Sequence, residues 1–204
     1  LHKDVEQMAS ASRVPFINGL CEKYHPVQAL CDLAIMKEKV GDLEGKKIVY
    51  SGMFNNVCNT LLDGCTKMGM EVVTFTPEFN EPSRDGELMA AVQATGLWRE
   101  TKDLKKEVKD ADFIYTDSWV DMEFYDDPAY ASEKERRMKA MLPAQVNAKL
   151  LGGSKAFIMH DMPIHEGFEM TRDAIDHAQS IIFDQAESRL HGEKAILLFL
   201  LNKL

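Results

Sequence analysis

The sequence predicts an α/β fold in which a doubly wound, Rossmann-like parallel sheet carries helices on both faces. Two observations lead to this prediction. Short apolar runs of strand length alternate along the chain with longer stretches in which apolar residues recur at helical spacing. Of the 204 residues, 45% are hydrophobic, which is enough to bury a sheet between two layers of helices.

The first third of the chain supplies three helices and one strand of this fold. Residues 4–12 have helical spacing, and a second helix starts at Pro26, a favoured place for proline, and stops at Gly41. The apolar run at 48–51 predicts the first strand. A helix is expected to follow it over residues 56–68.

The alternation continues along the rest of the chain. Further apolar runs of strand length lie at residues 72–76, 113–115 and 156–159. Helical spacing is found at residues 81–95 and 100–110. Asp184 is expected to be the N-cap of a last helix whose far end is strongly apolar, so that this helix needs a surface to pack against.

The charge balance argues against nucleic acids and membranes as partners. The formal net charge is -9, whereas nucleic-acid and anionic-membrane surfaces need clustered Lys and Arg. No run of about 18 apolar residues is present to span a bilayer. Four cysteines lie in apolar or helical stretches without a C-x-x-C pair, which predicts buried free thiols and a reducing cytoplasm: Cys21, Cys31, Cys58 and Cys65.

Polar residues concentrate where three predicted strands end. "SGMFNNV" follows the strand at 48–51, "TDSWVDME" follows the strand at 113–115, and "HDMPIHE" follows the strand at 156–159. Ligands of open α/β sheets bind beyond the carboxyl ends of the strands. If the three strands are neighbours, one crevice is lined by Asn55, Asn56, Asp117, Asp121, His160 and Asp161.

Neither a dinucleotide nor a metal is predicted at this crevice. The glycine-rich fingerprint G-x-G-x-x-G is absent. Four possible metal ligands lie close together in the sequence: His160, Asp161, His165 and Glu166. Their spacing fits no zinc signature, and Pro163 keeps the two histidines off a common helix face. We therefore expect no metal and no cofactor.

Several polar residues at helices have an ordinary structural explanation as well as a functional one. Asn56 could cap the helix that it precedes. His25 and Gln28 project from the same turn at the positive end of a helix, where capping would also account for them. Arg189 has the spacing to pair with Glu193.

Five stretches in order resemble the aspartate/ornithine carbamoyltransferase family, on its ornithine and putrescine side. They are "INGLCEKYHPVQALCDL", "GMFNNVCNTLL", "YTDSWVDME", "MHDMPIHEG" and "FDQAESRLHGEKAILLFLL". The resemblance covers nearly the whole chain, which it identifies as the second, amine-binding half of such an enzyme. It implies the transfer of a carbamoyl group from carbamoyl phosphate to a small amine.

The resemblance also implies roles for single residues. The H-P-x-Q residues His25 and Gln28 would contact the carbamoyl group, and Arg189 of the A-E-x-R helix would hold carbamoyl phosphate. Negative charge grows on the carbonyl oxygen during the attack, so donors such as His25 and Arg189 would stabilise the transition state. Around the amine, the family pattern places Asn56, Asp117 and the H-C-L-P loop, which here begins at His160.

The same resemblance divides the chain into four parts. Residues 1–24 would be the tail of an N-terminal carbamoyl-phosphate domain, 25–40 an interdomain helix, 41–184 the amine-binding domain, and 185–204 a helix that returns to the first domain. The family's S-x-R-T-R phosphate loop and an initiator Met do not occur. We therefore expect a fragment that is inactive alone. The resemblance also implies a homotrimer, and the free cysteines favour the cytoplasm as its location.

Two departures from the family pattern affect the amine side. Asp121-Met122 stands where the family has Ser and Met of S-M-G, and Asp161-Met162 stands where it has Cys and Leu of H-C-L-P. Acidic residues repel a carboxylate and attract an ammonium group. With Asp117 they predict a cation-selective pocket for a diamine or another amine without a nearby carboxylate. The alternative is a non-catalytic amine-binding domain or paralogue.

Overall fold

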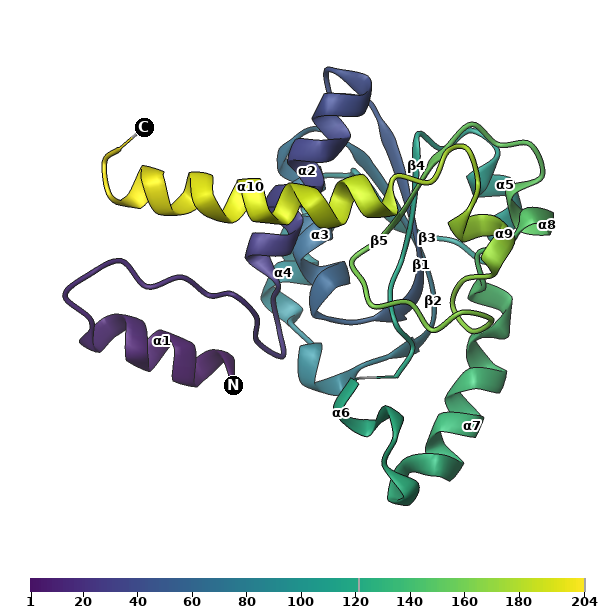
Figure 1. The fold of residues 1–204 in the computed structure, drawn as a ribbon, viewed down its shortest axis with the longest axis horizontal. Helices are drawn as coiled ribbons and strands as arrows, with labels where there is room; N and C mark the ends of the chain where they lie inside the picture. The colour runs from purple at the N-terminus through teal and green to yellow at the C-terminus, as the bar shows by residue number, and fades with distance from the viewer. Residues whose placement is uncertain (121, 204) are drawn as a thin grey trace.

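Five parallel strands form the sheet of the computed structural model (Figure 1). The structure describes residues 1–120 and 122–203, without the side chains of Met122 and Glu123. In sheet order the strands are β3 (Trp98–Glu100), β2 (Glu71–Phe79), β1 (Lys47–Phe54), β4 (Phe113–Thr116) and β5 (Phe157–His160). The predicted parallel α/β sheet is confirmed, since every adjacent pair runs parallel.

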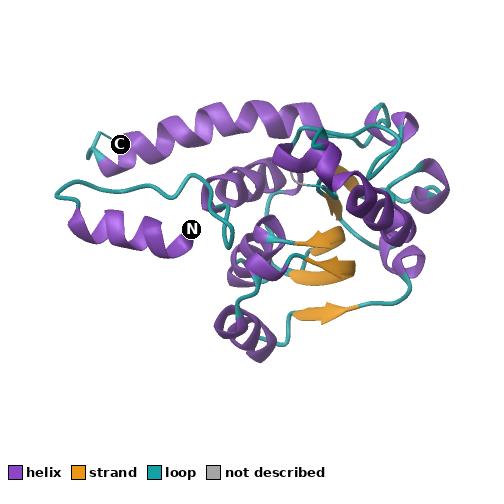
Figure 2. Cartoon of the chain, turned by 90° about the horizontal axis from the view of Figure 1, so that it is seen from below, coloured by secondary structure: helices purple, strands orange, loops and turns teal. Residues whose placement is uncertain are grey.

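Helices lie on both sides of this sheet (Figure 2). They are α1 (His2–Ala11), α2 (Pro26–Val40), α3 (Asn56–Lys67), α4 (Gly86–Ala94), α5 (Leu104–Val108), α6 (Met122–Tyr125), α7 (Ala131–Met141), α8 (Ala148–Leu151), α9 (Arg172–Ile175) and α10 (Ile182–Leu200). Short 3-10 turns occur at η1 (Glu81–Ser83), η2 (Pro128–Tyr130) and η3 (Leu142–Ala144).

Each face of the sheet has its own hydrophobic core because side chains alternate along a strand. Ile48 and Tyr50 of β1 belong to a buried cluster with residues of α2, α3 and α4. Val49, which lies between them, belongs to a second buried cluster with residues of α5, α8 and α9. Both faces of the central strand are therefore buried, as the apolar run predicts.

The structure corrects the predicted helix at 100–110. Its helical part is only α5, and the short strand β3 precedes it and pairs with β2. The strand escapes sequence patterns because it has three residues at the edge of the sheet, and only Trp98 among them is buried. Burial of the indole anchors this edge, with Trp98 Nε1 donating to Thr74 Oγ1 at 3.1 Å.

Three predicted helix starts are also corrected. The helix predicted at 81–95 is divided into η1 and α4, with Asp85 as the N-cap whose side chain accepts from Leu88 N. Asn55, rather than Asn56, is the N-cap of α3 and accepts from Cys58 N. Asp184 lies in the first turn of α10, after the N-cap Ile181, where its negative charge still suits the helix dipole.

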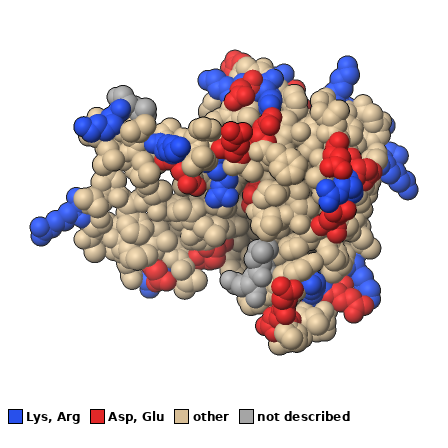
Figure 3. All heavy atoms as spheres, in the orientation of Figure 1, with Lys and Arg blue, Asp and Glu red and all other residues tan. Residues whose placement is uncertain are grey.

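Helix α10 packs along α2 and then extends beyond the sheet domain, above α1 (Figure 1). Figure 3 shows little charge over α1 and the segment that follows it. Large exposed apolar side chains of this region are Val14, Phe16, Ile17, Leu20, Leu197, Leu198, Phe199 and Leu201. The four cysteines are buried and free, as predicted. Among the described helices, none has the length and apolar content needed to cross a membrane.

A buried ion cluster ties β1, β3 and α5 together. Lys47 Nζ lies 2.7 Å from Glu107 Oε2, and the guanidinium of Arg99 donates to both oxygens of Glu107 at 2.9 and 2.6 Å. The hydrogen bonds from Arg99 lower the pKa of Glu107 to about 2, against the effect of desolvation and with further help from Lys47. Lys47 also pairs with the largely exposed Asp110.

Replacement of the buried carboxylate should destabilise the fold. We expect E107Q to lower the free energy of unfolding at pH 7 by about 2 to 3 kcal/mol, because it leaves the buried ammonium of Lys47 and the half-exposed guanidinium of Arg99 without their central partner. The depressed pKa means that this contribution is present above the unfolded-state pKa of 4.5 and lost as the pH falls toward about 2. Urea unfolding of E107Q at several pH values measures it.

The matched control is D110N, which removes the exposed partner of Lys47. Its side chain is 74% exposed, so the loss should stay below about 1 kcal/mol. Equal effects of E107Q and D110N would contradict the assignment of the buried pair as the stabilising one.

Candidate functional site at the carboxyl ends of β1, β4 and β5

The strand order places the three polar loops side by side. Strand β1 pairs with β2 on one side and with β4 on the other, and β4 pairs with β5. The chain direction across the sheet reverses at the β1/β4 boundary, the position where open α/β sheets bind ligands. The expectation that the loops after these strands share one edge is confirmed.

Asp117, the first residue after β4, is held from two sides. Asn55 Nδ2, from the end of β1, donates to Asp117 Oδ2 at 2.5 Å, and the backbone N–H of Ser118 donates to Oδ1 at 2.6 Å. Asn55 is oriented in turn by the Tyr50 hydroxyl, which donates to its Oδ1 at 3.1 Å. The carboxylate is therefore positioned by neutral donors, and no described cation pairs with it.

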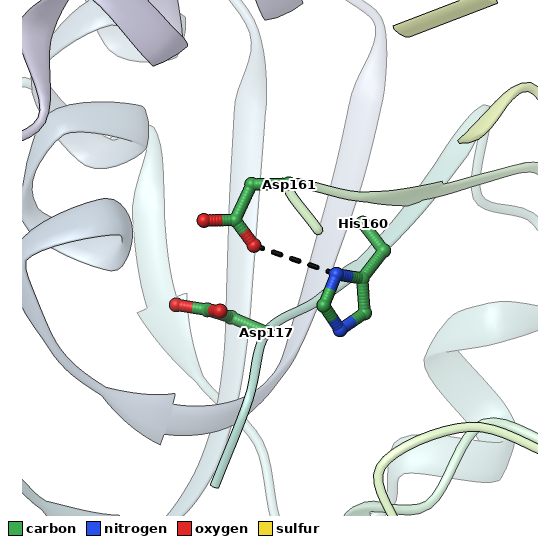
Figure 4. Close-up of side chains that lie close together, drawn as sticks. All are labelled: Asp117, His160 and Asp161. Atoms are coloured by element: carbon green, nitrogen blue, oxygen red, sulfur yellow. Dashed lines mark ion pairs between the residues drawn. The ribbon is translucent and has the colours of Figure 1, made fainter. Parts of the chain in front are cut away.

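Asp161, which stands in the family's Cys position, follows β5 and faces Asp117, which follows the neighbouring strand β4. In Figure 4 both carboxyl groups and the His160 ring converge on one point, and Asp161 Oδ1 lies 3.5 Å from His160 Nδ1. The Asp161 side chain is only 10% exposed. Burial raises the pKa of Asp161, and the charge of Asp117 raises it further. A cation that binds between the two carboxyl groups would offset this repulsion.

His160 stabilises the loop that carries Asp161. Its Nδ1 accepts the backbone N–H of Met162 at 2.8 Å, and its Nε2 lies 3.4 Å from Glu169 Oε1. His160 and Glu169 are completely buried. Met162 has a φ of 64° and precedes a cis peptide bond to Pro163, whose carbonyl accepts from Ser118 Oγ at 3.0 Å. The loop after β5 is thus bound to the loop after β4.

The predicted carbamoyl-phosphate residues lie beside a cavity at the end of α2. His25 and Arg189 both line this cavity of about 670 Å³, together with Gly19 and Leu197 from the two ends of the chain. Burial lowers the pKa of His25, Arg189 lowers it further, and Asp117 opposes the change. The backbone N–H of His25 donates to Thr60 Oγ1 of α3 at 2.9 Å, and the N-cap of the same helix is Asn55, which holds Asp117, so α3 links the two halves of the site.

Three polar atoms of the predicted carbamoyl-phosphate residues have no hydrogen-bond partner among the described residues: His25 Nδ1 and Arg189 Nε, whose residues line the cavity, and Gln28 Oε1. Arg189 Nη2 lies 3.8 Å from Glu193 Oε1, which confirms the predicted spacing but leaves the guanidinium largely free to bind a ligand. Buried polar atoms normally have partners, so unpaired ones beside a cavity mark a place for a polar ligand.

The other predicted residues have mixed placements. Gln28 is buried near the site and donates to Asp32. Asn56 turns away and donates to the carbonyl of Cys21 at 2.8 Å, so it ties the N-terminal segment to α3. Asp121 and the side chain of Met122 lie outside the described part of the chain. Sequence reasoning missed three buried residues behind the site, which are Asp32, Glu169 and Gln185; only Asp32, four residues after Gln28 on one helix face, offered a signal.

The acidic pair and His160 together offer a possible set of metal ligands. Ligand atoms of Asp117, His160 and Asp161 all lie within 4.8 Å of one another, so the geometry could hold a divalent cation. His160 Nδ1, however, already accepts the N–H of Met162. This leaves carboxylate oxygens alone, which suit an ammonium group equally well.

The fold therefore brings together a cavity lined by His25 and Arg189 and a pair of buried acids, Asp117 and Asp161, at the carboxyl edge of the sheet. Residues 44–200 match the family model of the aspartate/ornithine carbamoyltransferase Asp/Orn-binding domain, and residues 1–38 match that of the carbamoyl-P-binding domain. The chain belongs to the aspartate/ornithine carbamoyltransferase family.

Three relatives show how far the likeness extends. The ornithine carbamoyltransferase of Pyrococcus horikoshii is 43% identical over 98% of this chain and 63% of its own length. The solved ornithine carbamoyltransferase of Pyrococcus furiosus has a TM-score of 0.84 at 40% identity, over 97% of this chain and 63% of that one. An N-acetyl-L-ornithine transcarbamylase structure has a TM-score of 0.79 at 26% identity, with coverages of 98% and 63%. The chain therefore spans just under two thirds of these relatives.

Removal of one buried acid should stabilise the protein. We expect D161N to raise the free energy of unfolding by about 1 kcal/mol at pH 8, because an amide avoids repulsion by Asp117. Because the pKa of Asp161 is raised in the folded state, the wild-type protein loses stability as the pH rises from the unfolded-state pKa toward the folded-state pKa. The advantage of D161N should therefore grow with pH. Thermal and urea unfolding between about pH 5 and pH 8 measure the difference.

D176N is the control, since the Asp176 side chain is 62% exposed and its carboxylate remains solvated. It should leave stability nearly unchanged at every pH. A D161N protein less stable than wild type at pH 8 would contradict the repulsion between the two acids.

Proposed function

We propose that the protein containing this chain is a carbamoyltransferase that moves the carbamoyl group of carbamoyl phosphate to a cationic primary amine. The acceptor that suits the site best is a diamine or another amine without a nearby carboxylate. The observation that carries the proposal is the pair of buried carboxyl groups, Asp117 and Asp161, which face each other without a described cation between them. An ammonium group would supply the missing positive charge.

The acidic pair is the reason to expect an acceptor other than ornithine. The Cys-to-Asp change at position 161 adds a negative charge next to Asp117, and a substrate carboxylate close by would be repelled. The transcarbamylase of N-acetyl-L-ornithine among the relatives supports variation in the acceptor within this fold.

The site residues suit each step of the transfer. Asp161 has a raised pKa, which makes its carboxylate a better acceptor for the proton that the ammonium group must lose. The neutral nitrogen then forms a bond to the carbonyl carbon while His25 and Arg189 stabilise the negative carbonyl oxygen. The bond from that carbon to the phosphate oxygen breaks, and phosphate leaves with the electron pair. The nitrogen, which is positively charged after the attack, gives its second proton to the departing phosphate, so that a neutral carbamoyl product and inorganic phosphate result.

The remaining features of the proposal come from the family. The resemblance implies that residues 1–24 complete a carbamoyl-phosphate domain, that 25–40 connect it to the amine domain at 41–184, and that 185–204 return to it. The apolar ends of the chain around the 670 Å³ cavity support such a contact. A cytoplasmic homotrimer belongs to the same proposal.

Loss of a donor in the anionic half should slow the transfer. We expect R189M, which keeps the apolar stem, to lower kcat/KM for carbamoyl phosphate about a hundredfold or more in the full-length protein. The control E193Q removes only the weak partner of Arg189 and should change the rate less than about threefold. Steady-state kinetics measure both, and a fully active R189M would contradict the assigned role.

The acceptor is tested by kcat/KM for ornithine, putrescine, lysine and agmatine in the full-length protein. We expect putrescine or agmatine to exceed ornithine by about tenfold or more, because one unpaired buried charge is worth at least about 1.4 kcal/mol. D161C, which restores the family residue, should move the ratio toward ornithine. A wild-type preference for ornithine would contradict the charge argument, and binding of amines without any carbamoyl transfer would favour the non-catalytic alternative.

A further inference from the structure

A chain of buried hydrogen bonds joins the two halves of the site, and Asp32 lies at its centre. Asp32 is on α2 and is completely buried. Its Oδ1 accepts from Gln28 Nε2 at 2.8 Å and from Gln185 Nε2 at 2.7 Å. Its Oδ2 accepts from the Tyr115 hydroxyl at 2.8 Å. Helices α2 and α10 and strand β4 thus meet at one carboxylate.

Asp32 decides the orientation of both glutamine amides. An ionised carboxylate only accepts hydrogen bonds, whereas an amide has a donating and an accepting end, so each NH2 group must face Asp32 and each oxygen must face away. Gln28 Oε1 is buried without a hydrogen-bond partner in the described part of the chain. Gln185 Oε1 accepts the backbone N–H of His160 at 2.9 Å.

We propose that Asp32 is a positioning residue for carbamoyl transfer. Its carboxylate holds Gln28 with the amide oxygen free to accept from the NH2 of the carbamoyl group and, through Gln185, holds the end of β5 that carries His160 and Asp161. The inference rests on the proposed carbamoyl transfer and adds the residue that aligns the donor side with the acceptor side.

The arrangement holds only while Asp32 is ionised. A protonated carboxyl group would offer an O–H donor, toward which Gln28 could turn its oxygen and so present its NH2 group to the ligand. Burial raises the pKa of Asp32 to about 6, and its hydrogen bonds, first that from Tyr115, oppose the rise. Titratable or charged groups that act on Asp32 or are acted on by it are Tyr115, Arg189, Cys31, Cys65 and Asp161.

The sign of the pH effect follows from this pKa. Binding of carbamoyl phosphate should be strongest above about pH 6 and weaken as the pH falls through that value, where Asp32 becomes protonated. The Y115F variant removes a hydrogen bond that lowers this pKa but leaves the carboxylate in place. Its affinity should therefore fall at a higher pH than that of wild type.

The experiment is a calorimetric titration of full-length wild type, D32N and Y115F with carbamoyl phosphate from about pH 5 to pH 8. D32N, of equal size but with a donor in the carboxylate position, should bind about tenfold to a hundredfold more weakly at pH 8. Y115F should match wild type at pH 8 and bind more weakly near pH 6. The ratio of variant affinity to wild-type affinity at one pH is compared, because the ionisation of the ligand and of His25 affects both proteins equally.

The outcomes separate this inference from the proposed function. The role of Asp32 is overturned, and the proposed function is not, if wild type binds carbamoyl phosphate and D32N binds it with equal affinity. The same conclusion follows if the ratio of Y115F affinity to wild-type affinity does not change with pH. Wild type without carbamoyl-phosphate binding overturns the proposed function. If D32N does not fold, Y115F decides the question, because it keeps the charge and tests the same pKa.

Discussion

The site depends on the pairing of β1 with β4 at the point where the sheet order reverses. From β1 the chain adds β2 and β3 on one side of the sheet, and β4 and β5 then follow on the other side. The loops after β1 and β4 therefore diverge and have room to form a pocket between them. Asn55 and Asp117 meet there by a direct hydrogen bond. Since β5 continues the sheet next to β4, Asp161 reaches the same pocket.

Burial of acids at this pocket is unfavourable for the fold and useful for binding. The buried Glu107, by contrast, is paired with Arg99 and Lys47. Asp117 and Asp161 instead have each other as neighbours, and burial, reinforced by the charge of Asp117, raises the pKa of Asp161. A site of this kind is completed by its ligand, and the bound cation would provide the stabilisation that the free protein lacks.

The sequence predicts the parts of this protein that follow from local patterns. The four longer strands, the parallel sheet and the crevice residues Asp117 and Asp161 were accessible because apolar runs end in concentrated polar residues. The edge strand β3 was not, since three residues carry no period. The Asp32 network was also beyond reach, because Gln185 and Tyr115 contact it from far along the chain and only the fold brings them together.

The cap of α3 shows the same limit on a small scale. Asn55 and Asn56 are adjacent and equally suited to capping, and the exact end of β1 decides which of them caps the helix. Asn55 thereby becomes the residue that orients Asp117, while Asn56 faces the N-terminal segment. A shift of one residue at a strand end changes which side chain enters a site.

A crystal structure of the full-length protein with putrescine and an unreactive phosphonate analogue of carbamoyl phosphate tests the central claim most directly. We predict that one amine nitrogen of putrescine lies within about 3 Å of a carboxylate oxygen of Asp117 or Asp161. The other amine nitrogen should lie outside the pocket. The carbamoyl-like end of the analogue should lie between His25 and Arg189. An Asp161 side chain turned to solvent, with the amine bound elsewhere, would contradict the account.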